Sequence, residues 1–195
     1  MTYKHPVKRG RGRHELIAAT LRLIAQQGLH ATTLRDIAAD SRLSLGSTTY
    51  HFADRDSLMA GALEVHVADT EHLVDQAVAT SREQRDVRAD GGVHSVVAAL
   101  LADRAQVIIR HELRLEATRT TAYRELHARS RAALRRALSS ALLVDSRPTE
   151  EAVDQFAAAL EETAIEAAIA NRDPAKFAAA MTGHLDEKFA NRIAG

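Results

Sequence analysis

Apolar residues return every three or four positions through most of the chain, which is the spacing of one buried face of an α-helix. The first such segment predicts a helix over residues 12–27, and Gly28 follows it as a residue suited to end a helix. Two short helices, of about 34–40 and 44–51, come next. A longer helix then opens at Asp54, because the apolar spacing continues from Leu58 to Ala77.

The second half of the chain repeats this pattern. Residues 80–92 lose the apolar spacing and contain Gly91 and Gly92, so they predict a loop. Beyond it we expect helices over 93–103, 105–118, 121–143, 150–171 and 174–191. Because no β-branched or aromatic run has the length of a strand, the sequence predicts an all-α fold of nine helices.

The two short helices carry polar residues where helices are capped. Thr33 precedes the first and is followed three residues later by Asp36, which is the spacing of a capping box, and Ser44 precedes the second. Residues 41–43 form the turn between them. Two short helices joined in this way predict a helix-turn-helix, whose second helix enters the major groove of DNA.

The second short helix is rich in groups that donate to phosphates or meet base edges. These hydroxyl, phenol and imidazole groups belong to Ser44, Ser47, Thr48, Thr49, Tyr50 and His51. A polar surface helix without any partner is the alternative reading.

Positive charge gathers at the same end of the chain. Residues 1–55 hold nine Lys and Arg against four acids, although the whole chain balances 26 basic residues with 26 acidic ones. This asymmetry favours a polyanionic partner at that end. Residues 1–13 predict a flexible arm suited to the DNA minor groove, with basic residues Lys8, Arg9, Arg11 and Arg13, or else a solvated tail.

Three stretches resemble the tetracycline-repressor (TetR) family of bacterial regulators. They are Thr33-Leu34-Arg35-Asp36-Ile37-Ala38, Ser44-Leu45-Gly46-Ser47-Thr48-Thr49-Tyr50-His51-Phe52 and Arg55-Asp56-Ser57-Leu58. The remaining two thirds resemble the family in length and in the number and order of helices. The resemblance implies that Thr33 and Arg55 hold phosphates, that Ser44, Ser47, Thr48 and Thr49 face the groove floor, and that Tyr50 and His51 face the DNA backbone.

Two positions depart from the family pattern. Arg42 stands in the turn where the family usually has glycine, and Thr49 stands where it usually has a phosphate-binding tyrosine. At a positive φ, a side chain such as that of Arg42 costs ~1 kcal/mol.

The last two helices predict an association surface. Their apolar stripes contain Val153, Phe156, Leu160 and Ala164 on one helix and Phe177, Met181 and Leu185 on the other. Alanines between them allow helices to approach closely, which suits a four-helix interface in a homodimer. Burial within one subunit is the alternative.

The resemblance further implies a small-molecule effector inside the helical body. The polar or aromatic candidates for its pocket are His66, His111, Glu112, Arg114, Tyr123 and Phe156. Each of them also fits an ordinary core or surface position.

Other classes of protein find little support. The chain has no Cys, its longest apolar runs fall short of the ~20 residues that span a bilayer, and we expect a cytoplasmic protein. Neither His14-Glu15 nor His111-Glu112 continues into a His-Glu-x-x-His motif, and phosphate-binding glycine loops are missing, so we expect no enzyme, metal or cofactor.

We therefore expect three parts: a basic arm (1–13), a helix-turn-helix domain (14–54) and an effector-binding and dimerisation domain (55–195). The predicted function is a regulator of transcription that binds a palindromic operator in double-stranded DNA and is released by a small-molecule effector. A helical adaptor, a non-specific nucleic-acid-binding protein and a helical enzyme with an unrecognised site are the alternatives.

Overall fold

The computed structural model describes residues 9–84, 93–141 and 149–173, and these form helices and turns without a strand. The all-α prediction is therefore confirmed. The helices are α1 (Arg9–Gln27), α2 (Leu34–Asp40), α3 (Leu45–His51), α4 (Arg55–Gln84), α5 (Val93–Leu101), α6 (Arg104–Ala117), α7 (Thr121–Ala141) and α8 (Glu150–Ile169). The ninth predicted helix, with Phe177, Met181 and Leu185, lies outside the described residues.

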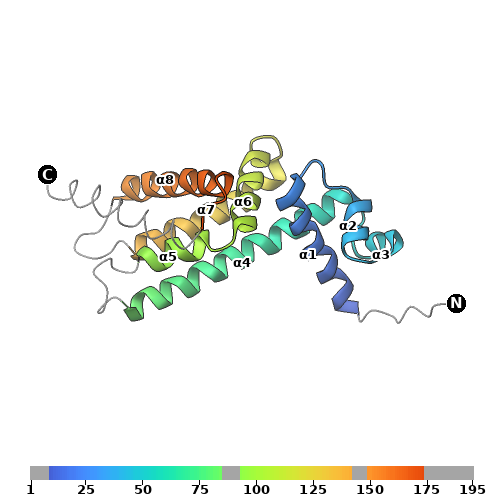
Figure 1. The fold of residues 1–195 in the computed structure, drawn as a ribbon, viewed down its shortest axis with the longest axis horizontal. Helices are drawn as coiled ribbons and strands as arrows, with labels where there is room; N and C mark the ends of the chain where they lie inside the picture. Colours follow the sequence, from blue (N-terminus) through green and yellow to red (C-terminus); the bar gives the residue numbers. More distant parts are fainter. Residues whose placement is uncertain (1–8, 85–92, 142–148, 174–195) are drawn as a thin grey trace.

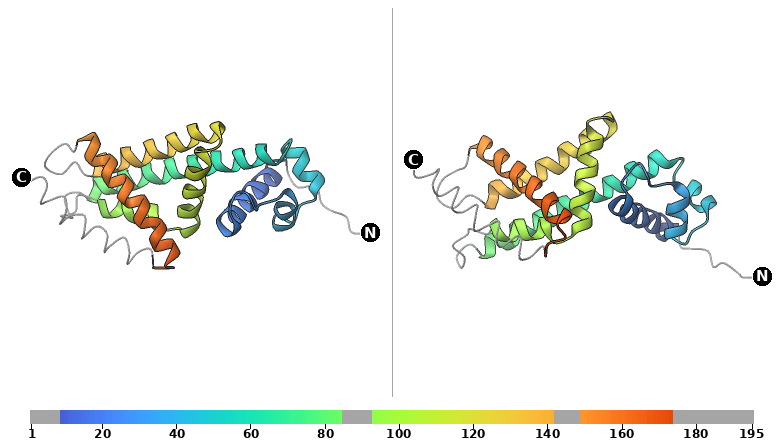
Figure 2. Two further views of the ribbon diagram at one scale, coloured as in Figure 1. Left: turned by 90° about the horizontal axis from the view of Figure 1, so that it is seen from above. Right: turned by 45° about the horizontal axis from the view of Figure 1, so that its top comes forward.

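Helix α4 is the axis of the molecule. Figure 1 shows α1, α2 and α3 gathered at one end of it and α5, α7 and α8 beside the other end. Helix α6 stands between the two groups, as the second view in Figure 2 shows, and it contacts α1, α4, α7 and α8. At ~1.5 Å per residue, the 30 residues of α4 span ~45 Å.

Two apolar cores share this axis. The first joins α1 with the first half of α4 and with α6, through residues such as Leu16, Leu63 and Leu113. The second joins the far half of α4 with α5, α7 and α8, and it includes Phe156, which has 1% of its surface exposed. The predicted boundary at residue 54 falls at the start of α4, yet the first core continues across it into α6 and α7.

Side chains close the helix ends as the sequence predicts. Thr33 caps α2 in a complete capping box with Asp36, and Ser44 caps α3 by accepting from the amide of Ser47. Arg42 has a φ of 57°, so the turn does hold a side chain in the left-handed region. Its strain is ~1 kcal/mol.

The arm predicted for residues 1–13 is wrong in its second half, because α1 already begins at Arg9. Packing against α3 and its end explains the difference. A Cβ on Gly12 would lie 2.8 Å from Nε2 of His51, and the guanidinium of Arg13 lies 5.2 Å from the centre of the Phe52 ring. Gly12 therefore serves a close approach between helices, whereas the sequence suggested a flexible segment.

Candidate nucleic-acid interface and helical body

The turn between α2 and α3 is held by short-range hydrogen bonds. The hydroxyl of Thr33 accepts from the amide of Asp36 at 3.2 Å and donates to its carboxylate at 2.6 Å. Hydrogen bonds from Thr33 hold the pKa of Asp36 below its usual value. The Thr33 hydroxyl is thus engaged in capping, and its contact with a phosphate stays a prediction.

Helix α3 presents an open face at the end of the molecule. Tyr50 is 70% exposed and Leu45 45% exposed, and Ser44 and Thr49 are exposed beside them. Ser47 and His51 are partly exposed. This face carries hydroxyl, phenol and imidazole groups with one leucine, so it offers both polar and methyl contacts to a groove.

Thr48 does not belong to that face. The prediction that it meets the groove floor is wrong, because Thr48 is 0% exposed and its hydroxyl donates to the carbonyl of Ser44 at 3.4 Å. Thr48 lies four residues before the buried Phe52, so both side chains fall on the inward side of the helix. The four-residue spacing between Thr48 and Phe52 is the pattern in the sequence that indicates the burial of Thr48.

Leu45 was missed by sequence reasoning because leucine suggests a core position. As the first residue of α3 it stands before the inward-facing stretch, and the capping bond of Ser44 fixes its position at the exposed tip. An apolar side chain next to polar ones on a groove-reading helix suits the methyl group of thymine.

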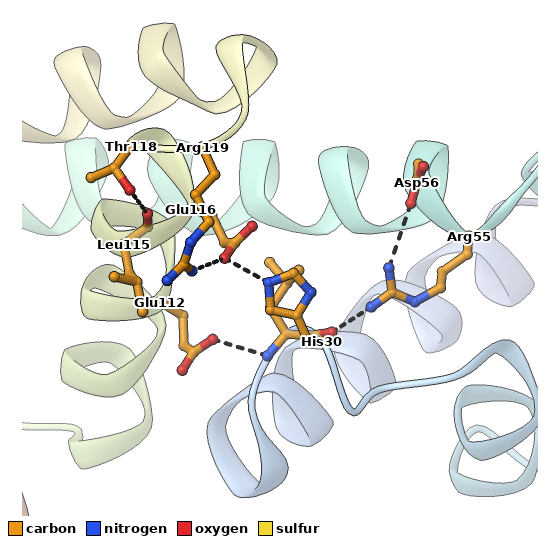
Figure 3. Close-up of polar contacts among 9 residues, drawn as sticks. His30, Arg55, Asp56, Glu112, Leu115, Glu116, Thr118 and Arg119 are labelled. Carbon is orange, nitrogen blue, oxygen red and sulfur yellow. Dashed lines mark hydrogen bonds and ion pairs between the residues drawn. The ribbon is translucent and has the colours of Figure 1, made fainter.

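Arg55 bonds backbone carbonyls of the α1–α2 loop, and its predicted contact with a phosphate stays a prediction. Its Nε donates to the carbonyl of Thr32 at 2.8 Å, and its Nη2 donates to the carbonyl of Leu29. Nη1 lies 3.5 Å from Asp56. The guanidinium therefore ties the loop between α1 and α2 to the start of α4, as Figure 3 shows.

The basic residues of the predicted arm differ in where they lie. Lys8 lies outside the described residues, and Arg9 begins α1. Arg11 is exposed and lies 3.7 Å from Glu15, while Arg13 lies over Phe52. Arg11 remains accessible to a polyanion from the helix.

The six residues predicted for an effector pocket are not brought together. Glu112 lies at the contact with the α1–α2 loop, where its carboxylate accepts from the amide of Leu29 at 3.0 Å. Tyr123 belongs to the first core and Phe156 to the second. Arg114 is exposed, and burial raises the pKa of Tyr123. His111 is partly buried and bonds the Val107 carbonyl of its own helix.

His66, the sixth predicted pocket residue, is a fully buried polar side chain. It is 0% exposed, and neither ring nitrogen has a hydrogen-bond partner within the described part of the chain. Burial, with a smaller effect of the Arg110 charge, lowers its pKa to about 4. His66 is therefore neutral near pH 7, and the side chain of Gln106 on α6 lies near enough to oppose this lowering of its pKa.

An internal cavity lies between α4, α6, α7 and α8, with α5 at its edge. It is lined by Thr70, Leu100, Arg110, Ser130, Leu134, Leu160, Glu161 and Ala164. None of the six predicted pocket residues lines it. Arg110 was detectable in the sequence, because it is a lone cation directly after the apolar run Val107–Ile109.

The stripe on α8 faces inward. Val153, Phe156, Leu160 and Ala164 are each at most 3% exposed within the single chain, where α8 packs on α6 and α7. Their assignment to a dimer interface was therefore wrong, and the alternative of burial within one subunit is correct. The open side of α8 instead carries Ala158, Ala159 and Ile169, of which Ile169 is 69% exposed.

A polar junction connects the α1–α2 loop to α6 (Figure 3). His30 Nε2 lies 2.7 Å from Oε1 of Glu116, and Arg119 donates to the same oxygen at 2.9 Å. Glu116 is buried at 3% exposure. Together with the bond between Leu29 and Glu112, these contacts tie the loop that precedes α2 to the helical body.

The described ranges contain no cluster of three or more His, Cys, Asp and Glu residues that suits a metal ion. No helix among them is long and apolar enough to cross a membrane.

Comparison with known proteins places these features in context. Residues 16–62 match the family of bacterial regulatory proteins called the tetR family. The transcriptional regulator BetI of Paraburkholderia xenovorans is 40% identical over 89 residues, which are 45% of this chain and 43% of that protein. BetI of Burkholderia cenocepacia is 37% identical over 93 residues. The matched segment thus spans less than half the length of these relatives.

Solved structures extend the likeness to nearly the whole chain. A TetR-family member from Streptomyces coelicolor A3 is 26% identical, with a TM-score of 0.69 over 89% of this chain and 97% of that one. The multidrug binding protein EbrR, solved with proflavin, is 26% identical, with a TM-score of 0.59 over 89% of this chain and 99% of that one.

Proposed function

We propose that the chain is a transcriptional regulator of the tetR type that binds a specific DNA sequence through α3, because residues 16–62 match the tetR family and BetI of Paraburkholderia xenovorans is similar over 89 residues. The observation that carries the proposal is the capped α2–α3 pair with its exposed, hydroxyl-rich outer face. In this arrangement the second helix enters the major groove while neighbouring residues contact the DNA backbone.

Four side chains are assigned to the groove itself. Ser44, Ser47 and Thr49 supply hydroxyl oxygens for base edges, although the Thr49 hydroxyl also donates to the Gly46 carbonyl and the Ser44 and Ser47 hydroxyls also bond each other. Leu45 supplies an apolar contact for a thymine methyl group. Tyr50 and His51 lie at the far end of α3, and we assign them to the phosphates. The ring centres of Tyr50 and His51 are 5.0 Å apart in an edge-to-face contact.

The regulator acts as a homodimer on a palindromic operator. One seven-residue helix reads only a few base pairs, and two-fold dimers solve this by placing two such helices on half-sites one or more turns apart. The open side of α8, with Ala158, Ala159 and Ile169, is the described surface that supports this association. We assign the protein to the cytoplasm, where it meets DNA.

The effector response passes through α6. This helix lines the internal cavity through Arg110 and bonds the α1–α2 loop through Glu112. A shift of α6 on effector binding therefore displaces the loop that leads into α2. Its expected consequence is release from the operator, which makes the protein a repressor.

Selection of fragments from the source genome, followed by titration of the selected DNA at several salt concentrations, tests the proposal. We expect tight binding to one palindromic sequence, a steep salt dependence, and at least about tenfold weaker binding by Tyr50→Ala. Glu125→Ala is the matched control, because Glu125 is exposed on α7, away from α3. A steep salt slope without sequence preference indicates non-specific nucleic-acid binding, and no binding indicates an adaptor or an enzyme.

A further inference from the structure

The internal cavity between α4, α6, α7 and α8 has the composition of a binding site. Leu134 and Leu160 supply apolar walls, while Thr70, Ser130 and Arg110 bring polar groups to the same space. As it stands, the cavity has room for about one water molecule. Anything larger enters only if the leucine side chains move apart.

Arg110 is the least compensated charge of the cavity. Within the described ranges its one hydrogen bond runs from Nη2 to the carbonyl of Leu100 at 2.9 Å. Burial lowers its pKa to about 10, which the nearby charges of Glu161 and Asp103 oppose. At neutral pH the guanidinium stays charged with donors to spare, since it carries five N–H groups.

Glu161 does not neutralise Arg110 by itself. Its carboxylate already lies 3.5 Å from Arg114 and 3.5 Å from Arg131, and no ion pair within the described ranges joins it to Arg110. Arg131 is in turn shared with Asp154, at 3.7 Å. The charged residues of the cavity wall are thus Arg110 and Glu161, and Glu161 is paired with two arginines outside the wall, whereas Arg110 has no ion pair within the described ranges.

A second buried polar side chain, His66, lies near Arg110 but does not line the cavity. It precedes Thr70 by one helical turn on α4, and it lies close enough to Arg110 for that charge to act on it. A buried donor or acceptor without a partner costs ~1–3 kcal/mol. Such a cost in the core, beside a cavity and a buried cation, is typical of a ligand site.

We propose that this cavity binds a small monocarboxylate, whose anionic group accepts from Arg110 and whose apolar body lies between Leu134 and Leu160. A cation is repelled by Arg110, and a neutral apolar molecule leaves the spare donors unpaired. A phosphate dianion carries more charge than this one buried guanidinium offsets. Binding itself does not depend on DNA recognition, but its role as the effector signal rests on the proposed function.

Titration of the full-length protein with butanoate, hexanoate and benzoate tests the inference. Butanol, hexanol, benzyl alcohol and butylamine are the matched probes without the negative charge. We expect the carboxylates to raise the melting temperature and to give measurable heats of binding, and the other probes to bind at least about tenfold more weakly. Equal binding of acids and alcohols, or no binding of any carboxylate, overturns the proposal.

Variants assign the contacts. Arg110→Gln is expected to weaken carboxylate binding about tenfold or more, whereas Arg114→Gln, which pairs with Glu161 but does not line the cavity, changes it less than about twofold. His66→Leu, next to the cavity but outside its lining, is expected to raise the melting temperature without ligand and to change carboxylate binding less than Arg110→Gln does. If Arg110→Gln fails to fold, Arg110→Lys replaces it, and unchanged affinity in the folded variant overturns the proposal.

The same titrations in the presence of operator DNA separate the two proposals. Carboxylate binding with unchanged DNA affinity supports the cavity assignment and contradicts its role as an effector site. DNA binding without any response to carboxylates supports the regulator and overturns the ligand class.

Discussion

The amide of Leu29, just after α1, donates to the carboxylate of Glu112 in the middle of α6 at 3.0 Å. These residues are 83 positions apart in the chain, and they join the helix-turn-helix to the helical body. Gly28, with a φ of 85°, allows the chain to turn directly beneath that carboxylate.

Replacing this carboxylate tests how firmly the two parts are joined. Glu112→Ala is expected to lower the free energy of unfolding by about 1–2 kcal/mol, because a buried amide loses a charged acceptor. Urea unfolding measures it, with Glu125→Ala as the exposed control. A change of the same size in both variants contradicts the assigned role of Glu112.

Close packing at Gly12 predicts an effect opposite to helix propensity. Alanine is the better helix former by ~1 kcal/mol, yet a Cβ at this position meets the His51 ring at 2.8 Å. We expect Gly12→Ala to displace His51 and to weaken DNA binding several-fold. The double variant Gly12→Ala with His51→Ala removes this close contact, so we expect it to be more stable than Gly12→Ala alone. Thermal melting measures the stability of both variants, and DNA titration measures their affinity.

The strained turn predicts a stabilising substitution. Arg42→Gly is expected to raise the free energy of unfolding by about 0.5–1 kcal/mol, because glycine adopts the φ of 57° without steric cost. Arg42→Ala removes the same side chain but keeps the strain. If Arg42→Gly and Arg42→Ala melt at the same temperature, relief of backbone strain does not stabilise the Arg42→Gly variant.

A substitution at Thr48 tests which side of α3 contacts DNA. Thr48→Val removes a hydroxyl that is buried and bonded to its own helix, so we expect DNA affinity within about twofold of the original protein. Ser47→Ala, at the partly exposed neighbouring position, should weaken binding to the selected sequence. A loss in Thr48→Val alone, with its fold intact, would falsify the assignment of the outer face.

The buried imidazole predicts a dependence of stability on pH. The pKa of His66 is about 4 in the folded chain and 6.5 when exposed, so the unfolded chain binds more protons between these values. Stability is therefore fully present above pH 6.5 and falls as the pH drops towards 4, by about 3 kcal/mol in total. His66→Leu should flatten this slope in urea titrations, apart from a smaller contribution of His127, whose pKa burial also lowers.

The sequence predicted local structure well because local interactions determine it. Caps such as Thr33 and Ser44 act within three residues, and the apolar spacing located all eight described helices, although α4 runs on to Gln84 where a loop was predicted from residue 80. The start of α1, three residues earlier than predicted, depended on Gly12 and Arg13 packing against His51 and Phe52, almost forty residues away.

The candidate sites were harder to predict because they depend on which faces meet. The stripe of Val153 and Phe156 looked the same for an interface and a core, and only the position of α8 on α6 and α7 decides between them. Likewise, Arg55 and Glu112 bond to the backbone of the α1–α2 loop, and backbone acceptors leave no pattern in a sequence. From residue type alone, the sequence suggested a phosphate contact for Arg55 and an effector contact for Glu112.

The first core, shared by α1, α4 and α6, limits how this protein can be recombined. A DNA-binding fragment that ends at residue 54 would lose the packing partners of Leu16 and Ile24, because Leu63, Ile109 and Leu113 lie beyond that residue. Transplanting its specificity onto another regulator therefore requires either the outer face of α3 alone, or α1 to α4 together with the matching surface of α6. A graft made at the apparent border between the two parts would expose the apolar residues that hold the reader in place.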